Sequence, residues 1–545
     1  MKNKRKPLGT NDPLRHADHS RPNTRRDFIK QGFISGPAAV LTGSVFGLFN
    51  NPREAFAEVS ADLTQLAADT QCNLGGVADG AAKIPFICFD LAGGANFASS
   101  NVLVGTDGQM DLLTTAGYSK MGVPGDIIPG LPDTNLAGTM LNLSTNADFT
   151  NDQLGLKFHS DSALLFGILE KFTSVAPGLV DGAVIPARSG NDTSNNTHNP
   201  LYGIAKAGAV GSAVTLIGSR NSESGGNSMA PPGLINPEIR PTKVDRPTDV
   251  TGMIDVGDLT SILSTKEDVT AVMESMARIS HKKLNASITQ NDVVRDLVKC
   301  GYLKAADIAE RFADKQVDPA LDPLIVGDTG AIFTPTQFNG TDRGEFQKTA
   351  SVMKMVIDGY AGAGSITMGG FDYHTGDRIA GENRDLRAGR CIGACLEYAA
   401  QNDSPLMIYV FSDGSVASNG TLDNTGDPAD NSSGRRLGGR GKGVWTGDNS
   451  STACSFFLVF DPNGTISTFS GSTMTDHRQI GRFSANGSVV TSATPAANNV
   501  NLLVNTVIAN YMSLNGDLGS FADADKFANH GLGDYTQYVS FNPLA

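Results

Sequence analysis

The feature that most constrains the fold is a series of short apolar runs separated by stretches with helical periodicity. Such runs occupy residues 83–91 (KIPFICFDL), 179–185, 213–218 and 406–411 (LMIYVF). Each has the length and composition of a strand buried on both faces of a parallel sheet. The alternation predicts an α/β fold with a large, mainly parallel sheet and helices on both faces.

One further run, residues 365–374 (SITMGGFDYH), combines a strand pattern with chemically useful side chains. The glycine pair ends the strand and predicts a loop, and ligands bind at such positions in open α/β sheets. Asp372 and His374 lie two residues apart on this loop. Oxygen and imidazole nitrogen are common zinc ligands, so the stretch predicts metal binding. The alternative is a surface turn with two solvated side chains.

Two other predicted strands also end near an aspartate, Asp90 and Asp413. Because parallel strands present their carboxyl ends at one edge, these acids should lie near Asp372, and divalent metals need several such ligands. A later pair, Asp476 and His477, can supply a second histidine. The alternative for Asp90 is a glycine turn in which its carboxylate caps a backbone amide.

The N-terminal region has the pattern of an export signal. Residues 24–30 (TRRDFIK) match the twin-arginine motif, an apolar run follows at 33–49, and Ala55-Phe56-Ala57 fits a cleavage site. We therefore expect residues 1–57 to be a twin-arginine signal peptide, recognised by the twin-arginine export machinery, and the protein to be periplasmic or secreted. A membrane anchor or a core helix is the alternative, but the run is glycine-rich and weakly apolar for a stable span.

Removal of the leader makes the charge more acidic. The remaining 488 residues carry 33 basic and 52 acidic side chains, a net charge of −19. Such a surface disfavours nucleic acid and anionic lipid as partners. No other segment has the length and apolarity of a membrane span, so no stable span is expected after cleavage.

We expect residues 58–82 to be a lead-in and residues 83–545 to form one large domain. A helical or lid-like insertion is predicted around 219–345, and residues 414–452 read as a long, solvated polar loop. The acids of that loop lack the spacing of an EF-hand. The six cysteines allow fifteen pairings, and their contexts favour mostly buried thiols with one or two bridges.

Several motifs together resemble a known family. The twin-arginine leader, a first strand followed by Gly-Gly-Ala-Asn (93–96), MGGFDYH (368–374) and FSDG (411–414) are similar to the bacterial exported proteins grouped as domain-of-unknown-function family 1501. The resemblance covers roughly residues 83–515. That family is placed with the alkaline-phosphatase and sulfatase superfamily, which implies a large α/β sandwich and metal-dependent hydrolysis or transfer of phosphate or sulfate esters.

The resemblance also implies roles for individual residues. Asp90 matches the first metal-ligating acid, Asp372 and His374 match the second set, and Asp413 matches the acid after the next strand. The family has a Ser-His pair before a helix, where this chain reads Thr197-His198. We expect Thr197 to be the nucleophile, and the alternative is that it caps the helix. The implied cofactor is a divalent metal, zinc first, with manganese or calcium as alternatives.

The chain departs from the family pattern after FSDG, where a Thr-Asp-His-Gly is expected. His477 (in TDHR) fits by residue type, whereas Asp448 (in TGDNSS) fits by position. The leading hypothesis is an exported, metal-dependent hydrolase of small anionic phosphate or sulfate esters. The alternative is a non-catalytic envelope or surface protein that keeps the fold as a scaffold and binds a surface polymer. A third hypothesis is a carbohydrate-binding or calcium-stabilised surface protein.

Overall fold

The computed structural model describes residues 60–69, 83–133, 143–190, 196–254, 263, 265–285, 292–312, 315–426 and 437–544. The expected signal peptide, residues 1–57, and most of the expected lead-in lie outside these ranges. Within the ranges, none of the helices combines the length and apolarity required to cross a bilayer.

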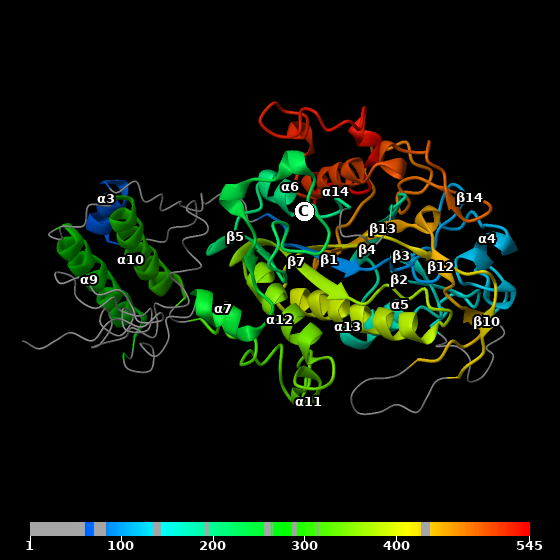
Figure 1. The fold of residues 1–545 in the computed structure, drawn as a ribbon, viewed down its shortest axis with the longest axis horizontal. Coiled ribbons are helices and arrows are strands. Elements are labelled where there is room, and N and C mark those ends of the chain that lie inside the picture. The colour runs from blue at the N-terminus through cyan, green and yellow to red at the C-terminus, as the bar shows by residue number, and fades with distance from the viewer. Residues whose placement is uncertain are drawn as a thin grey trace, which may run out of the picture.

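A seven-stranded sheet forms the centre of the molecule, in the order β4-β13-β8-β1-β7-β5-β6 (Figure 1). Its strands are β1 (Phe86–Ala92), β4 (Val180–Pro186), β5 (Val214–Gly218), β6 (Thr242–Lys243), β7 (Ala361–Gly369), β8 (Leu406–Phe411) and β13 (Cys454–Phe460). All run parallel except β13, which is antiparallel to both of its neighbours. The predicted α/β fold with a mainly parallel sheet is confirmed.

Helices cover both faces of the sheet. The evidence is that every residue of β1 is buried although successive side chains point to opposite faces. Ile87 and Phe89 belong to a core shared with one group of helices, and Phe86 and Cys88 to a core shared with another. The first group is α5 (Ala163–Lys171), α12 (Arg343–Ile357) and α13 (Ile379–Gln401), and the second is α6 (Leu201–Lys206) and α14 (Val500–Leu514). Figure 1 shows the two groups on opposite sides of the sheet.

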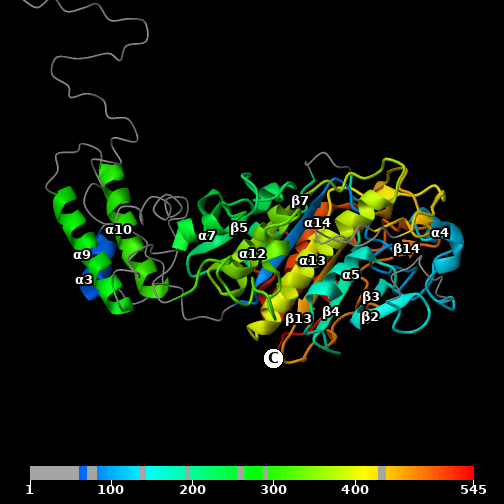
Figure 2. The ribbon, with the colours of Figure 1, turned by 90° about the horizontal axis from the view of Figure 1, so that it is seen from below.

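Three helices pack together away from the sheet, as both Figure 1 and Figure 2 show: α3 (Ala61–Asp69), α9 (Lys266–Asn285) and α10 (Asp292–Phe312). Arg278 on α9 binds Asp62 on α3 through hydrogen bonds of 2.6 and 2.8 Å. Two of the three helices come from the predicted insertion and one from the expected lead-in. The part of the lead-in that the structure describes is therefore packed against the insertion.

The remaining described helices and strands are short and surround the sheet. They are α4 (Thr115–Lys120), β2 (Thr150–Leu154), β3 (Leu156–His159), α7 (Pro247–Ile254), α11 (Pro335–Phe338), β9 (Val416–Ala417), β10 (Leu422–Asp423), β11 (Lys442–Gly443), β12 (Gly447–Asp448), β14 (Phe483–Ser484) and β15 (Ser488–Val489).

Residues 414–452 differ from the expected solvated loop. Within their described part, β9 pairs with β12 and β10 with β11. Arg440, Lys442 and Trp445 are buried, and Trp445 is among the largest fully buried side chains of the protein. The expectation failed because the charged residues of this segment have buried partners from elsewhere in the chain, which local composition does not reveal.

The cysteines agree with the expectation of mostly buried thiols. Cys88, Cys391, Cys395 and Cys454 are free and buried. Cys300 is part of a disulfide.

Candidate functional site

The carboxyl ends of β1, β7 and β8 meet at one edge of the sheet. Asp90 lies opposite Thr367 on β7 and Phe411 on β8 in the strand register. Asp372 and Asp413 follow these two strands within a few residues. Three of the acids predicted as ligands therefore gather at one edge, which we call the rim.

The rim carries an exposed group of three potential ligands, Asp372, His374 and Asp448, whose donor atoms all lie within 4.8 Å of one another. His374 Nε2 is 2.6 Å from Asp372 Oδ1 and 3.7 Å from Asp448 Oδ1. The side chains of the two aspartates are 51% and 56% exposed, so solvent reaches the group freely. His477 and Asp448 were the two candidates for the last ligand position, and the structure places Asp448 in this group. We call Asp372, His374 and Asp448 the rim triad.

Buried contacts of Trp445 hold the two loops of the rim triad together. The backbone N–H of Gly376 donates to the Trp445 carbonyl at 2.8 Å, and the Trp445 N–H donates to the Asp377 carbonyl at 3.1 Å. The guanidinium carbon of Arg378 lies 4.2 Å from the centroid of the Trp445 ring, a cation–π geometry. Because Trp445 precedes Asp448 by three residues, these contacts bring Asp448 beside the loop that carries His374.

A buried ionic network lies around this contact. Arg378 Nε donates to Glu382 at 2.8 Å, and Arg440 and Lys442 donate to the other oxygen of Glu382 at 2.9 and 2.7 Å. Burial alone would raise the pKa of Glu382, but the three cations outweigh it and lower the pKa to about 2. Arg440 also pairs with the buried Asp161 at 3.0 Å. Removal of one member of such a network leaves an unpaired buried charge and strongly destabilises the fold. The intact network therefore holds the loops in place.

Asp90 is fully buried beneath the rim and is used internally. Its carboxylate accepts the backbone N–H groups of Asn227 at 2.5 Å and Ser228 at 2.9 Å, and the Thr367 hydroxyl at 3.4 Å. Burial raises the pKa of Asp90 to about 6 despite these bonds. The contacts match the alternative considered for Asp90, that its carboxylate binds backbone amides.

Asp413 is also fully buried, and it connects the loop after β8 to the loop after β1. Its Oδ1 accepts the backbone N–H of Gly93 at 2.8 Å. Gly93 has a φ of +126°, and a Cβ at this position would lie 2.3 Å from the Asp372 nitrogen. Glycine is therefore required where the β1 loop passes the β7 loop.

A serine that the sequence reasoning missed, Ser189, pairs with His198. The Ser189 Oγ lies 3.0 Å from His198 Nε2, and it donates to the Asp413 carbonyl at 2.6 Å. The His198 ring stacks on Phe411 with centroids 5.7 Å apart. Burial lowers the pKa of His198 to about 4, so the ring is neutral at pH 7. The signal that could have found Ser189 is its position just after β4, equivalent to that of Asp413 after β8.

Thr197 does not occupy the position expected of the nucleophile. Its hydroxyl donates to the side-chain oxygen of Asn501 at the start of α14. Helix α6 begins at Leu201 with Pro200 as its N-cap residue, so Thr197 does not cap this helix either. The hydroxyl held against His198 is that of Ser189, nine residues earlier in the chain.

His477 lies away from the rim, which corrects its assignment as a metal ligand. Its Nε2 is 3.5 Å from Asp181, at the start of β4. Through the register of β13 and β8, Asp181 is level with Phe86, the first residue of β1. Four residues separate that level from Asp90, a distance of about 13 Å along the strands. His477 therefore cannot share a metal with the rim residues.

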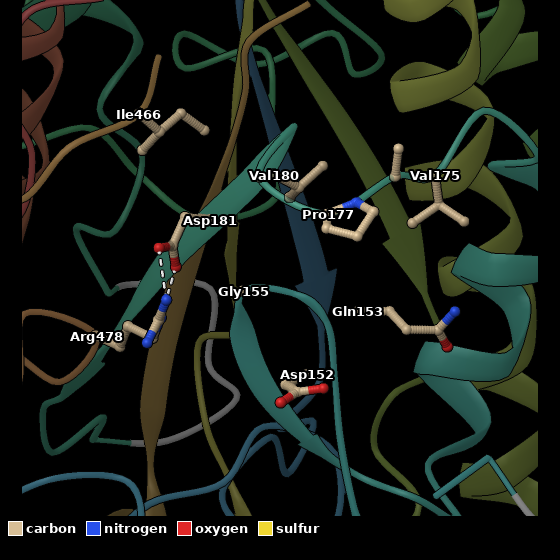
Figure 3. A pocket seen from close by; sticks show the side chains of 11 residues that line it. Asp152, Gln153, Gly155, Val175, Pro177, Val180, Asp181, Ile466 and Arg478 are labelled. Atoms are coloured by element: carbon tan, nitrogen blue, oxygen red, sulfur yellow. Dashed lines mark hydrogen bonds and ion pairs between the residues drawn. The ribbon is translucent and has the colours of Figure 1, made fainter. Parts of the chain in front are cut away.

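A pocket of about 540 Å³ lies at the far edge of the sheet and is lined by Asp181, the partner of His477. Figure 3 shows Asp181 in a two-pronged ion pair with Arg478, and Asp152 and Gln153, which belong to β2, apart from that pair. The paired charges leave no convergent reactive group in the pocket. We therefore base the candidate site on the chemistry of the rim rather than on pocket size.

Comparisons with known proteins leave this assignment to geometry alone. No protein-family model matches the chain, and a search of curated proteins found no similar sequence. The family resemblance that we draw from the motifs at 93–96, 368–374 and 411–414 stays a prediction.

Proposed function

We propose that the protein is an exported, metal-dependent hydrolase of phosphate or sulfate esters. The single observation that carries the proposal is the rim triad, in which one imidazole and two carboxylates from two distant loops converge. This set of nitrogen and oxygen donors suits Zn²⁺, with Mn²⁺ as the alternative. Ca²⁺ prefers more oxygen ligands and fits less well.

The geometry of the triad fits one ion. Ligand atoms that each lie about 2.1 Å from a tetrahedral zinc are about 3.4 Å from one another. The donor atoms of the triad are all within 4.8 Å, so small side-chain rotations bring them to this spacing. Three protein ligands on an exposed rim leave a fourth position for water or substrate, which is the arrangement of catalytic rather than structural zinc sites.

A bound cation would supply Lewis-acid polarisation of an ester oxygen. The chain's own contribution is the Ser189–His198 pair, connected to the rim through Asp413. His198 is neutral at pH 7. Once the Ser189 hydroxyl turns its single hydrogen from the Asp413 carbonyl to His198 Nε2, that nitrogen can accept the proton as the oxygen attacks phosphorus or sulfur. The proton then passes to the departing alcohol, and water hydrolyses the Ser189 ester in a second step.

Export belongs to the same proposal. The twin-arginine motif at residues 24–30 supports translocation of the folded protein to the periplasm or beyond. A route that carries folded proteins allows a metal to be bound before export.

A second candidate is a non-catalytic surface or envelope protein, and burial of the reactive groups favours it. Ser189 is 1% exposed, so an ester reaches its hydroxyl only after the surrounding chain rearranges. Asp90 already has its hydrogen bonds filled by backbone amides. In this case the rim is a scaffold, and a polymer rather than a small ester is its partner.

Metal content and turnover distinguish the candidates. Purified protein is assayed for bound metal by mass spectrometry and for release of p-nitrophenol from its phosphate and sulfate esters. The hydrolase predicts about one metal per chain, lost in Asp372→Ala, and turnover lost in both Asp372→Ala and Ser189→Ala. Asp523→Ala, an exposed aspartate elsewhere, is the matched control. Metal without turnover supports the scaffold, and absence of metal contradicts the hydrolase.

A further inference from the structure

A second pocket, unrelated to the rim triad, lies beside α6 and α14, which Figure 1 shows next to each other. Its volume is about 440 Å³. The ionisable residues that line it are Lys206, Lys526 and His530, and none of its lining residues is acidic. A pocket with only basic groups is unusual in a chain of net charge −13, because the average surface potential of such a protein is negative.

Local contacts hold both lysines at the pocket. The Lys206 Nζ lies over the Phe527 ring, 5.2 Å from its centroid. The Lys526 Nζ donates to the Lys206 carbonyl at 3.1 Å, which uses one of its three hydrogens. Neither lysine has a carboxylate partner among the ion pairs of the described residues. Their charges therefore remain available for a ligand.

Two neutral groups add hydrogen-bond donors. The backbone N–H of Leu532 donates to His530 Nδ1 at 3.1 Å, so the neutral ring carries its hydrogen on Nε2. Burial lowers the pKa of His530, which favours this neutral form. The side-chain oxygen of Asn501 accepts the Thr197 hydroxyl, which leaves the amide nitrogen of Asn501 as a donor at the pocket.

We infer that this pocket binds the phosphate or sulfate group of a small organic ester. Two ammonium groups and neutral N–H donors match an anion with several oxygens, and lysine is a common phosphate ligand. Pro231, Leu234 and Phe527 form an apolar wall beside these donors, which accommodates the organic part of the ester. The pocket therefore prefers an organic phosphate to inorganic phosphate, and it does so independently of the proposed hydrolysis at the rim.

Calorimetric titration of the full chain with phenyl phosphate and with inorganic phosphate tests the inference. We expect both to bind, phenyl phosphate more tightly, and affinity to fall as salt rises. The double variant Lys206→Gln, Lys526→Gln should weaken the affinity for both anions by about tenfold or more, because each charge-assisted hydrogen bond contributes strongly to binding. Lys206→Arg, Lys526→Arg should retain binding, since the positive charges remain.

Two controls keep this result separate from the rim. Lys243→Gln removes an exposed lysine whose partner is Asp245, and it should leave anion binding unchanged. Asp372→Asn should abolish metal binding and leave phenyl phosphate binding intact. The inference is overturned if the double lysine variant, folded by circular dichroism, binds phenyl phosphate as the unmodified protein does, or if Asp372→Asn abolishes that binding. Tighter binding of inorganic phosphate would overturn the role of the apolar wall.

Discussion

The rim holds its acids in two contrasting environments. Asp372 and Asp448 are more than half exposed, and both lie beside His374. Asp90 and Asp413 are fully buried at the same edge of the sheet, near the carboxyl ends of β1 and β8. One pair faces water, and the other is enclosed by backbone and hydroxyl donors.

The contrast shows that position at a strand end does not decide what an aspartate does. A buried carboxylate must have hydrogen-bond partners or become neutral, and the fold supplies backbone amides to Asp90. An exposed pair of carboxylates beside an imidazole has no such need and can bind a cation from solution. We therefore propose the exposed triad as the metal site, whereas the contacts of Asp90 give it a structural role.

The largest expected effect is on stability at the buried acid. Asp90→Ala leaves the N–H groups of Asn227 and Ser228 without their acceptor, and we expect a loss of about 3–5 kcal/mol in the free energy of unfolding. Asp372→Ala, at the exposed acid, should change it by less than about 0.5 kcal/mol without metal. Urea denaturation of both variants measures the difference, and equal losses would refute the division into buried and exposed roles.

The next largest effect is the dependence of the unfolding free energy on pH through His198. The pKa of His198 is about 4 in the folded protein and about 6.5 for a free imidazole, so the unfolded chain binds the extra proton between these values. Stability from this group is therefore present above pH 6.5 and is lost as pH falls toward 4, by about 3 kcal/mol. The raised pKa of Asp90 acts in the opposite direction, as its stability is lost when pH rises through about 6.

A variant separates the two opposing slopes. His198→Gln removes the histidine contribution, so the difference in unfolding free energy between it and the unmodified protein should grow by about 3 kcal/mol from pH 4 to pH 6.5. Any offset from altered packing against Phe411 is the same at each pH and cancels. A difference that does not vary with pH would contradict the buried, neutral histidine.

Metal affinity is expected to change by a somewhat smaller amount. His374→Ala removes the only nitrogen ligand of the triad, and zinc affinity should fall by at least about a hundredfold, since loss of an outer-shell partner already costs about tenfold to a hundredfold. His477→Ala is the matched control, because that ring contacts Asp181 at the opposite edge of the sheet. Titration with zinc and a competing chelator measures both constants. Equal losses in the two variants would mean that the triad is not the site.

The smallest effect is expected at Thr197. Thr197→Val removes one partly exposed hydrogen bond to Asn501 and should cost less than about 1 kcal/mol, with any ester turnover retained. Ser189→Ala, in contrast, should abolish turnover if the pair with His198 is catalytic. Loss of turnover in the Thr197 variant alone would restore Thr197 as the nucleophile.

Much of the fold could be predicted from local patterns. The runs at 83–91 and 406–411 became the central strands β1 and β8, because continuous apolar segments of this length are stable only when both faces are covered. The antiparallel direction of β13 could not be predicted, since an apolar strand has the same pattern in either direction. The gathering of Asp90, Asp372 and Asp413 at one edge followed from the parallel order of β1, β7 and β8.

The membership of the site could be predicted only in part. Asp372 and His374 were recognisable because they are two residues apart on one loop. Asp448 was one of two candidates for the last position, and the buried contacts of Trp445 and the network around Arg378 and Glu382 are what place it beside them. Ser189 contacts His198, nine residues further along the chain. Such contacts depend on partners far along the chain, which no local pattern encodes.

Residue order alone thus specifies which segments must be buried and which polar groups stand at their ends, because hydrophobic burial and strand length act locally. Three-dimensional packing decides which of those polar groups remains available. Asp90 is occupied because residues 227 and 228, more than 130 positions away, bring their amides to it. Asp372 stays exposed because nothing comparable covers it, and hydrogen bonding over such separations exists only in the assembled fold.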